Sequence, residues 1–148
     1  MAQVEKSVIV LHSARQMFDL VDRVEDYAHF LPWCGGTSIA ERSDREVVAT
    51  VMINYHGLKQ SFTTRNHRES PNLIRVSLEK GPFHDLSGEW HFTPLEENAC
   101  RIEFYLHYTF SSRVLEKVVG PVFDHIANSF VDAFIQQAEK VYRDEDRF

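Results

Sequence analysis

The chain has few of the residues that form disulfide bonds or flexible linkers. Its 148 residues include two cysteines, six glycines and five prolines. Cys34 and Cys100 form no C-x-x-C pair, so no disulfide framework is indicated and we expect a reduced, cytoplasmic protein. Because no Gly/Pro-rich stretch suggests a linker and no internal repeat occurs, we expect a single domain over residues 1–148, large enough for a real core.

Long apolar runs and an excess of positive charge are also missing. No run approaches the roughly 18 to 20 apolar residues that span a bilayer, and no charged segment followed by an apolar one opens the chain. Any membrane contact is therefore expected to be peripheral, on the inner-membrane surface. Sixteen Lys and Arg against 22 Asp and Glu give a net charge of −6, which disfavours DNA as a partner but leaves room for a local basic patch.

The N-terminal third predicts one strand and two helices. Residues 4–12 are rich in β-branched side chains, and Ser13 with Gln16 fits a capping box at a helix start. Residues 26–31 suggest a short second helix that ends at Pro32, because a residue before proline avoids helical geometry. An apolar stripe at helical spacing marks the first helix: Ala14, Met17, Phe18, Val21 and Val24.

The middle of the chain predicts antiparallel strands. Short turns separate segments at 37–43, 46–55, 58–69, 73–80, 84–93 and 100–110, too short for parallel crossovers. Alternation in the last strand separates two faces. The inward side chains are Ile102, Phe104, Leu106, Tyr108 and Phe110, and the outward ones are Arg101, Glu103, Tyr105, His107 and Thr109. The same alternation turns Ile74, Val76, Leu78, Leu86, Trp90 and Phe92 inward.

The C-terminal segment predicts one long amphipathic helix over 112–143, with a kink or break near Gly120-Pro121. At 1.5 Å per residue it would run roughly 45 Å and could cross the whole sheet. The order of strand, two helices, six strands and a long helix predicts an α+β fold in which a curved sheet of six to seven strands wraps around the last helix. We expect residues 143–147, which are all charged, to be a solvated, fraying end.

This order resembles the helix-grip fold of START domains, the birch-pollen-allergen family and the polyketide cyclase/dehydrase family. Two segments sharpen the resemblance: YAHFLPWCGGTSI (27–39) and GPFHDLSGEWHFTPL (81–95) are similar to signatures of the coenzyme Q-binding START family. The spacing of Phe and Ala in the tail over 115–142 resembles the terminal helix of that family. Its bacterial members are also known as the ribosome-association toxin, and a chain that opens at the first strand looks like a bacterial member.

The resemblance implies a cavity between sheet and long helix that holds ubiquinone or a similar polyprenyl lipid, with no required cofactor. The expected ligand-binding side chains are Phe30, Trp33, Phe62, Leu78, Phe83, Trp90, Phe104, Phe123, Ile126 and Phe130. Ordinary core packing is the competing interpretation for this set. In HFLPWCGG (29–36), Trp33 would line the mouth of the ligand cavity beside a flexible hinge formed by Gly35 and Gly36. The alternative is that Trp33 packs at one end of the core. Phe83 would form a lid or lipid-touching tip, or contact the Trp33 loop.

Other chemistry has weaker support. His91 and His107 point outward by strand parity, His125 has no second ligand one helical turn away, and we expect no metal site. Neither cysteine has a nucleophile signature, and no G-x-S-x-G pattern occurs. General acid/base catalysis needs a buried titratable pair, which the sequence does not place, so no catalytic residue is assigned. The candidates for such chemistry are Asn54, Tyr55, Asp85 and Tyr108.

Three functions remain open. The favoured one is non-enzymatic binding of a polyprenyl quinone that supports respiration or quinone handling. The second, implied by the resemblance, is a toxin that binds the large ribosomal subunit and blocks subunit joining. The third is a polyketide cyclase or dehydratase. Outward cations could form a basic stripe for rRNA or anionic headgroups, but nearby Glu79, Glu89 and Glu103 favour a mixed surface. Those cations are Lys59, Arg65, Arg75 and Arg101.

Overall fold

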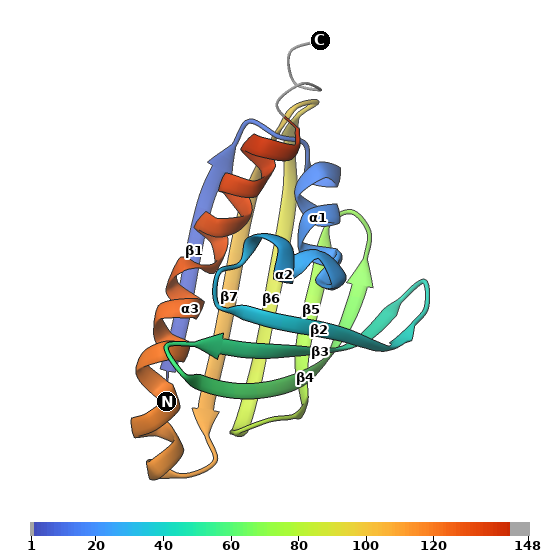
Figure 1. The fold of residues 1–148 in the computed structure, drawn as a ribbon. Coiled ribbons are helices and arrows are strands. Elements are labelled where there is room, and N and C mark those ends of the chain that lie inside the picture. Colours follow the sequence, from blue (N-terminus) through green and yellow to red (C-terminus); the bar gives the residue numbers. More distant parts are fainter. Residues whose placement is uncertain (1, 143–148) are drawn as a thin grey trace.

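A computed structural model describes residues 2–142, and an antiparallel sheet of seven strands dominates it (Figure 1). The strands are β1 (Ala2–Val10), β2 (Cys34–Arg42), β3 (Glu46–Tyr55), β4 (Leu58–Glu69), β5 (Leu73–Lys80), β6 (Phe83–Glu96) and β7 (Ala99–Phe110). Their order across the sheet is β1-β7-β6-β5-β4-β3-β2. The predicted meander is thus confirmed, and the first strand closes it beside the last.

Helices cover the concave face of the sheet (Figure 1). The long α3 (Arg113–Val141) crosses it, and α1 (Ala14–Asp22), a 3₁₀ turn η1 (Val24–Asp26) and α2 (Tyr27–Phe30) lie beside α3. Because β1 and β2 form opposite edges of the sheet, the chain from 11 to 33 must travel from one edge to the other across this face. The α+β helix-grip prediction is confirmed. Within residues 2–142, no helix is both long and apolar enough to cross a membrane.

Local sequence signals fix the helix starts. The predicted capping box is present: the Gln16 backbone N–H donates to Ser13 Oγ at 3.0 Å, and the Ser13 N–H donates to Gln16 Oε1 at 2.9 Å. Ser112 caps α3 with a single bond, in which the Leu115 N–H donates to Ser112 Oγ at 3.2 Å. These bonds satisfy backbone donors that have no partner in the first helical turn.

Of the two alternatives expected for the last helix, a kink or a break, the break does not occur, because α3 continues through Pro121. Pro121 is exposed, so the carbonyl one turn earlier, which loses its N–H partner, can be hydrated. The buried stripe on the other side of α3 holds the helix onto the sheet. It consists of Val119, Gly120, Phe123, Ile126, Ala127, Val131, Phe134 and Ala138.

The two glycines of HFLPWCGG are in a strand and not in a hinge. β2 begins at Cys34, three residues before the predicted start, and its pairing with β3 is irregular between Cys34 and Gly36. A Cβ on Gly35 would lie 2.9 Å from Asn54 Cβ on β3. Glycine is therefore required here for the close approach of two strands.

Candidate functional site

The sheet and helices enclose an interior cavity of about 90 Å³. Its walls come from β3 to β7 on one side, and from α1, η1, α2, the following loop and α3 on the other. Seven predicted ligand-binding residues line it: Trp33, Phe62, Trp90, Phe104, Phe123, Ile126 and Phe130. Strand parity and helical spacing therefore located most of the apolar wall.

The other three predicted residues lie outside the cavity wall. Phe83 is buried in an aromatic cluster, 5.1 Å from Phe110 and 4.9 Å from Phe123 between ring centroids, so it is neither a lid nor an exposed tip. Leu78 is half-buried beside the core. Phe30 lines a surface groove, and its ring packs 5.5 Å from that of Phe134 in the core.

Trp33 separates the interior cavity from that groove. The groove has a volume of about 670 Å³ and lies between the loop after α2, the end of β3 and the outer face of α3. Trp33 lines both spaces, although its own exposed fraction is 5%. Its ring packs 6.0 Å from that of Phe130, and its carbonyl accepts the Asn54 N–H at 2.8 Å. The indole is thus a wall with apolar cavity on one side and a partly polar groove on the other.

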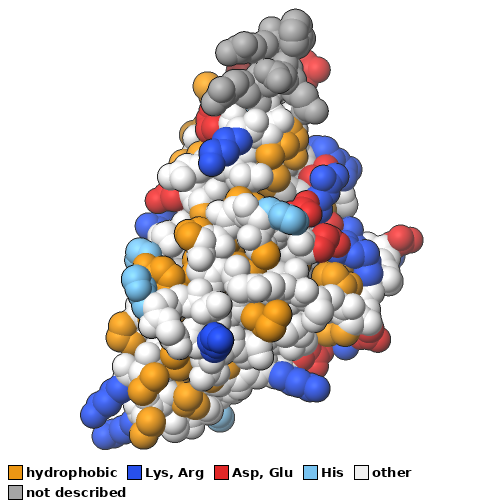
Figure 2. Space-filling view, viewed as in Figure 1, with side chains coloured by type: hydrophobic (Ala, Val, Ile, Leu, Met, Phe, Trp, Pro, Cys, Tyr) orange, Lys and Arg blue, Asp and Glu red, His pale blue; other side chains and the backbone are white. Residues whose placement is uncertain are grey.

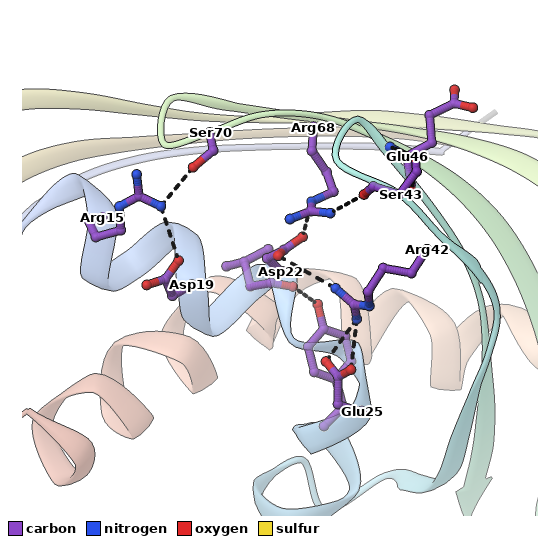
Figure 3. Close-up of polar contacts among 11 residues, drawn as sticks. Arg15, Asp19, Asp22, Glu25, Arg42, Ser43, Glu46, Arg68 and Ser70 are labelled. Carbon is purple, nitrogen blue, oxygen red and sulfur yellow. Dashed lines mark hydrogen bonds and ion pairs between the residues drawn. The ribbon is translucent and has the colours of Figure 1, made fainter.

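One end of the cavity is polar. Asp22, Thr64 and Asn66 line it, and Thr64 donates a hydrogen bond to Asn66 Oδ1 at 2.9 Å. Arg68 Nε on β4 lies 2.8 Å from Asp22 Oδ1, and Arg42 Nη1 on β2 lies 3.9 Å from Oδ2 (Figure 3). Charged groups from three elements therefore meet where α1 ends.

The same ion-pair network continues outward to solvent. Arg42 also binds Glu25, with Nη2 2.8 Å from Oε2, and Arg68 Nη1 donates to the Ser43 carbonyl at 2.8 Å (Figure 3). Burial raises the pKa of the Asp22 carboxyl, while the positive charges of Arg68 and Arg42 oppose that rise. Each charge in this network has an opposite charge beside it, so the polar end of the cavity is close to electrically neutral.

The four candidates for acid/base chemistry do not meet. Tyr108 donates its hydroxyl hydrogen to Asp124 on α3, and burial together with this bond raises the pKa of Tyr108. Asp85 lies 3.3 Å from His107 on the outward face, and Tyr55 stacks on His125 in the groove. Asn54 is exposed on β3. None of the four lines the cavity, so they form no shared catalytic centre.

Histidine and cysteine positions give no ligand set for a metal. Within residues 2–142, no group of three or more His, Cys, Asp or Glu side chains is arranged to hold an ion. His91 pairs with Glu89 at 2.9 Å. Cys34 and Cys100 are both buried and unpaired, and burial raises the pKa of each thiol. Both are small fillers of apolar space.

Comparison with known proteins decides the family. Residues 10–135 match the model of the family described as polyketide cyclase/dehydrase and lipid transport. The chain belongs to this family.

Relatives in the cyclase/dehydrase and lipid-transport family carry different names. A Vibrio cholerae protein named ribosome association toxin RatA is 42% identical over 142 residues, which cover 96% of this chain and 99% of that protein. The mitochondrial coenzyme Q-binding protein COQ10 of Drosophila melanogaster is 26% identical, over 91% of this chain and 57% of that protein. The crystal structure of the Zhui aromatase/cyclase superposes with a TM-score of 0.81 at 18% identity, covering 94% of each chain, which shows the shared fold.

Positive and negative side chains alternate on the surface of this family member. Arg65 binds Glu79 at 2.6 Å, Glu46 at 3.0 Å and Glu41 at 3.4 Å, and Arg75 binds Glu89 at 3.1 Å. On the face seen in Figure 2, red and blue side chains are interspersed. The mixed surface is therefore observed where Arg65 and Arg75 lie, and neither arginine is left to form a basic stripe.

Sequence reasoning missed the polar end of the cavity. Thr64, Asn66 and Arg68 could have been found, because they follow the inward-facing Phe62 at intervals of two along β4. Asp22 carried no such signal, since it lies outside the apolar stripe of its helix. Its place in the cavity wall depends on where α1 meets β4, which is a tertiary contact.

Proposed function

We propose that the protein binds a hydrophobic small molecule between its sheet and α3, and that a polyprenyl quinone such as ubiquinone is the ligand. The observation that carries the proposal is an interior cavity walled by aromatic side chains and closed at one end by polar ones. Small-molecule sites usually combine an apolar lining with a few polar groups that fix orientation. The name of the COQ10 relative supports the choice of a quinone.

The cavity volume limits how such a ligand could fit. At about 90 Å³ it is much smaller than the ~300 to 1,000 Å³ pockets that enclose drug-sized molecules. A quinone ring would require some widening, and a prenyl chain needs another path. The groove behind Trp33 offers that path, because it is larger and is partly lined by Phe30 and Pro32. We therefore expect the ring inside and the chain in the groove.

Filling the cavity tests the proposal. Ala49 lines the cavity from β3, while Ala40 is exposed on β2, so Ala49→Leu and Ala40→Leu make the same change inside and outside. Lipid is extracted from each purified protein and identified by mass spectrometry. We expect quinone from the wild type and Ala40→Leu, and little from Ala49→Leu. Equal ligand in all three proteins would contradict binding in this cavity, provided that circular dichroism shows a folded Ala49→Leu protein.

A second candidate function is association with the large ribosomal subunit. The 42% identity to a protein named ribosome association toxin supports it, whereas the net charge of −6 and the paired arginines offer little electrostatic attraction to RNA. Sucrose-gradient profiles with increasing amounts of purified protein test it. Loss of 70S ribosomes with accumulation of free subunits is the expected result for this function. Unchanged 70S formation at saturating protein would contradict it.

If the protein contacts a membrane surface, that membrane is the source of its lipid ligand. Val114 and Val118 are exposed in the first turns of α3, at 70% and 57%, and Arg113 and Lys117 lie beside them. Apolar and basic side chains together favour an anionic lipid surface. Co-sedimentation with phosphatidylglycerol vesicles should weaken in Val114→Asp and not in Leu11→Asp. Leu11 is exposed and directly follows β1, which ends far from the start of α3 (Figure 1). Equal binding by both variants would contradict this contact.

A further inference from the structure

The inward face of β4 changes from apolar to polar along its length. Phe62 packs at ring-centroid distances of 6.0 Å from Phe83 and 5.9 Å from Phe123, within the aromatic cluster. Thr64 and Asn66 follow it in the cavity wall, and Arg68 comes next, in contact with Asp22. A ligand lying along this strand would therefore meet hydrocarbon at one end and hydrogen-bonding groups at the other.

The Thr64–Asn66 pair leaves a donor free. Thr64 is almost fully buried, and its hydroxyl donates to the side-chain carbonyl oxygen of Asn66. With the Asn66 oxygen occupied in this bond, its NH₂ group is left to face other partners. Among residues 2–142, the Asn66 NH₂ group has no hydrogen-bond acceptor, although Asn66 lines the cavity. An amide in that position stabilises a ligand oxygen that accepts its hydrogen bond.

The charged side chains next to Asn66 favour a ligand oxygen that carries no charge. Arg68 and Arg42 lie beside Asp22, and Arg42 also binds Glu25, so the two positive charges are already matched by two negative ones (Figure 3). A carboxylate or phosphate brought to this end would meet the Asp22 charge without a free cation to compensate. A carbonyl or ether oxygen brings no charge, and needs one donor only.

We propose that Asn66, held in orientation by Thr64, is the headgroup donor of the cavity and that its ligand carries a neutral carbonyl oxygen on a ring. The ring carbonyl binds at the end near Asp22, and the hydrocarbon chain runs back past Phe62 and Trp33 toward the groove. This inference rests on the proposed function, because it assigns the orientation and headgroup class of a ligand in the same cavity.

Two matched ligands separate headgroup recognition from general apolar binding. Decylbenzoquinone and decylbenzene share a ring and a chain, and only the first has carbonyl oxygens. Their affinities are measured by displacement of the neutral fluorescent probe N-phenyl-1-naphthylamine. The wild type should bind the quinone more tightly than the hydrocarbon. Asn66→Leu should weaken quinone binding by about three- to tenfold, the value of one hydrogen bond, and leave decylbenzene binding unchanged or tighter.

Further variants keep the test decisive. Asn66→Asp preserves the shape of the side chain, removes its NH₂ donors and should weaken quinone binding at least as strongly as Asn66→Leu. Ser61→Val is the control, since Ser61 is exposed on the opposite face of β4. Equal losses for both ligands in Asn66→Leu would overturn the headgroup role, as would a wild type that does not distinguish them. If the wild type binds neither ligand, the proposed function itself fails.

Discussion

Replacing Trp33 by alanine should open the cavity to the groove and destabilise the protein. The indole is almost fully buried, packs against Phe130 and is the side chain that lines both spaces. Trp→Ala changes in cores cost about 3 to 5 kcal/mol. Water can fill the vacated space from the groove side, and the Trp33 carbonyl keeps its bond to Asn54, so we expect the lower end, about 3 kcal/mol.

That loss is measurable in two ways. Urea unfolding followed by circular dichroism gives the free energy of unfolding. For a chain of this size, ~3 kcal/mol corresponds to a decrease in melting temperature of roughly 6 to 12 °C. Dissociation of N-phenyl-1-naphthylamine into vesicles, followed by stopped flow, should be faster in Trp33→Ala than in the wild type, because the barrier between cavity and groove is gone.

Trp90→Ala is the matched control. Trp90 is also almost fully buried and lines the cavity, but it does not line the groove. It should lower stability by a similar amount without a comparable gain in the rate of probe dissociation. The role of Trp33 as a wall is refuted if its alanine variant loses less than about 1 kcal/mol, or if it releases the probe no faster than Trp90→Ala does.

Three further predictions concern protonation and capping. Because the pKa of Asp22 is raised on folding, the stability that Asp22 contributes is full at acidic pH and declines as pH rises through the raised value. Urea titrations should therefore show that the free energy of unfolding of Asp22→Asn rises relative to that of the wild type as pH increases from the acidic range through the raised pKa, and a constant difference would contradict this. Burial raises the pKa of Cys100 to about 11 and that of Cys34 above its ordinary value, so both should react slowly with Ellman's reagent at neutral pH until urea is added. Fast reaction of the folded protein would contradict their burial. Ser13→Ala should cost about 1 kcal/mol in urea unfolding by removing the α1 cap, and an unchanged midpoint would argue against it.

Periodic segments explain why so much of the fold could be predicted. The alternation of apolar and polar side chains in β7 and the apolar stripe of α3 each identify the buried side of an element without knowledge of its partner. Phe104, Phe123 and Phe130 were assigned to the interior in this way and line the cavity. The break expected at Pro121 does not occur, because the local loss of a hydrogen bond is outweighed by the burial of the helix on both sides of it.

Single residues in loops and at element ends were harder to place. Phe83 follows a Gly-Pro turn, which suggests exposure, yet Phe62, Phe110 and Phe123 surround it because the start of β6 lies against β4, the end of β7 and the N-terminal half of α3. Gly35 suggested a hinge and instead permits close pairing of β2 with β3. In both cases a contact between distant segments determines the role of the residue. The predicted fraying at 143–147 lies outside the described residues.

The sequence by itself determined the order of the elements, the inward faces of the strands and the long helix, because side-chain periodicity is a local property of the chain. The tertiary structure decided what that interior can hold. The cavity of about 90 Å³, its separation from the groove by Trp33 and the meeting of Asp22 with Arg68 all depend on how α1, α3 and the loop after α2 lie against the curved sheet. HFLPWCGG therefore contains the end of α2, the cavity-wall residue Trp33 and the first residues of β2. Its apolar side chains are packed because the chain here crosses the concave face of the sheet (Figure 1).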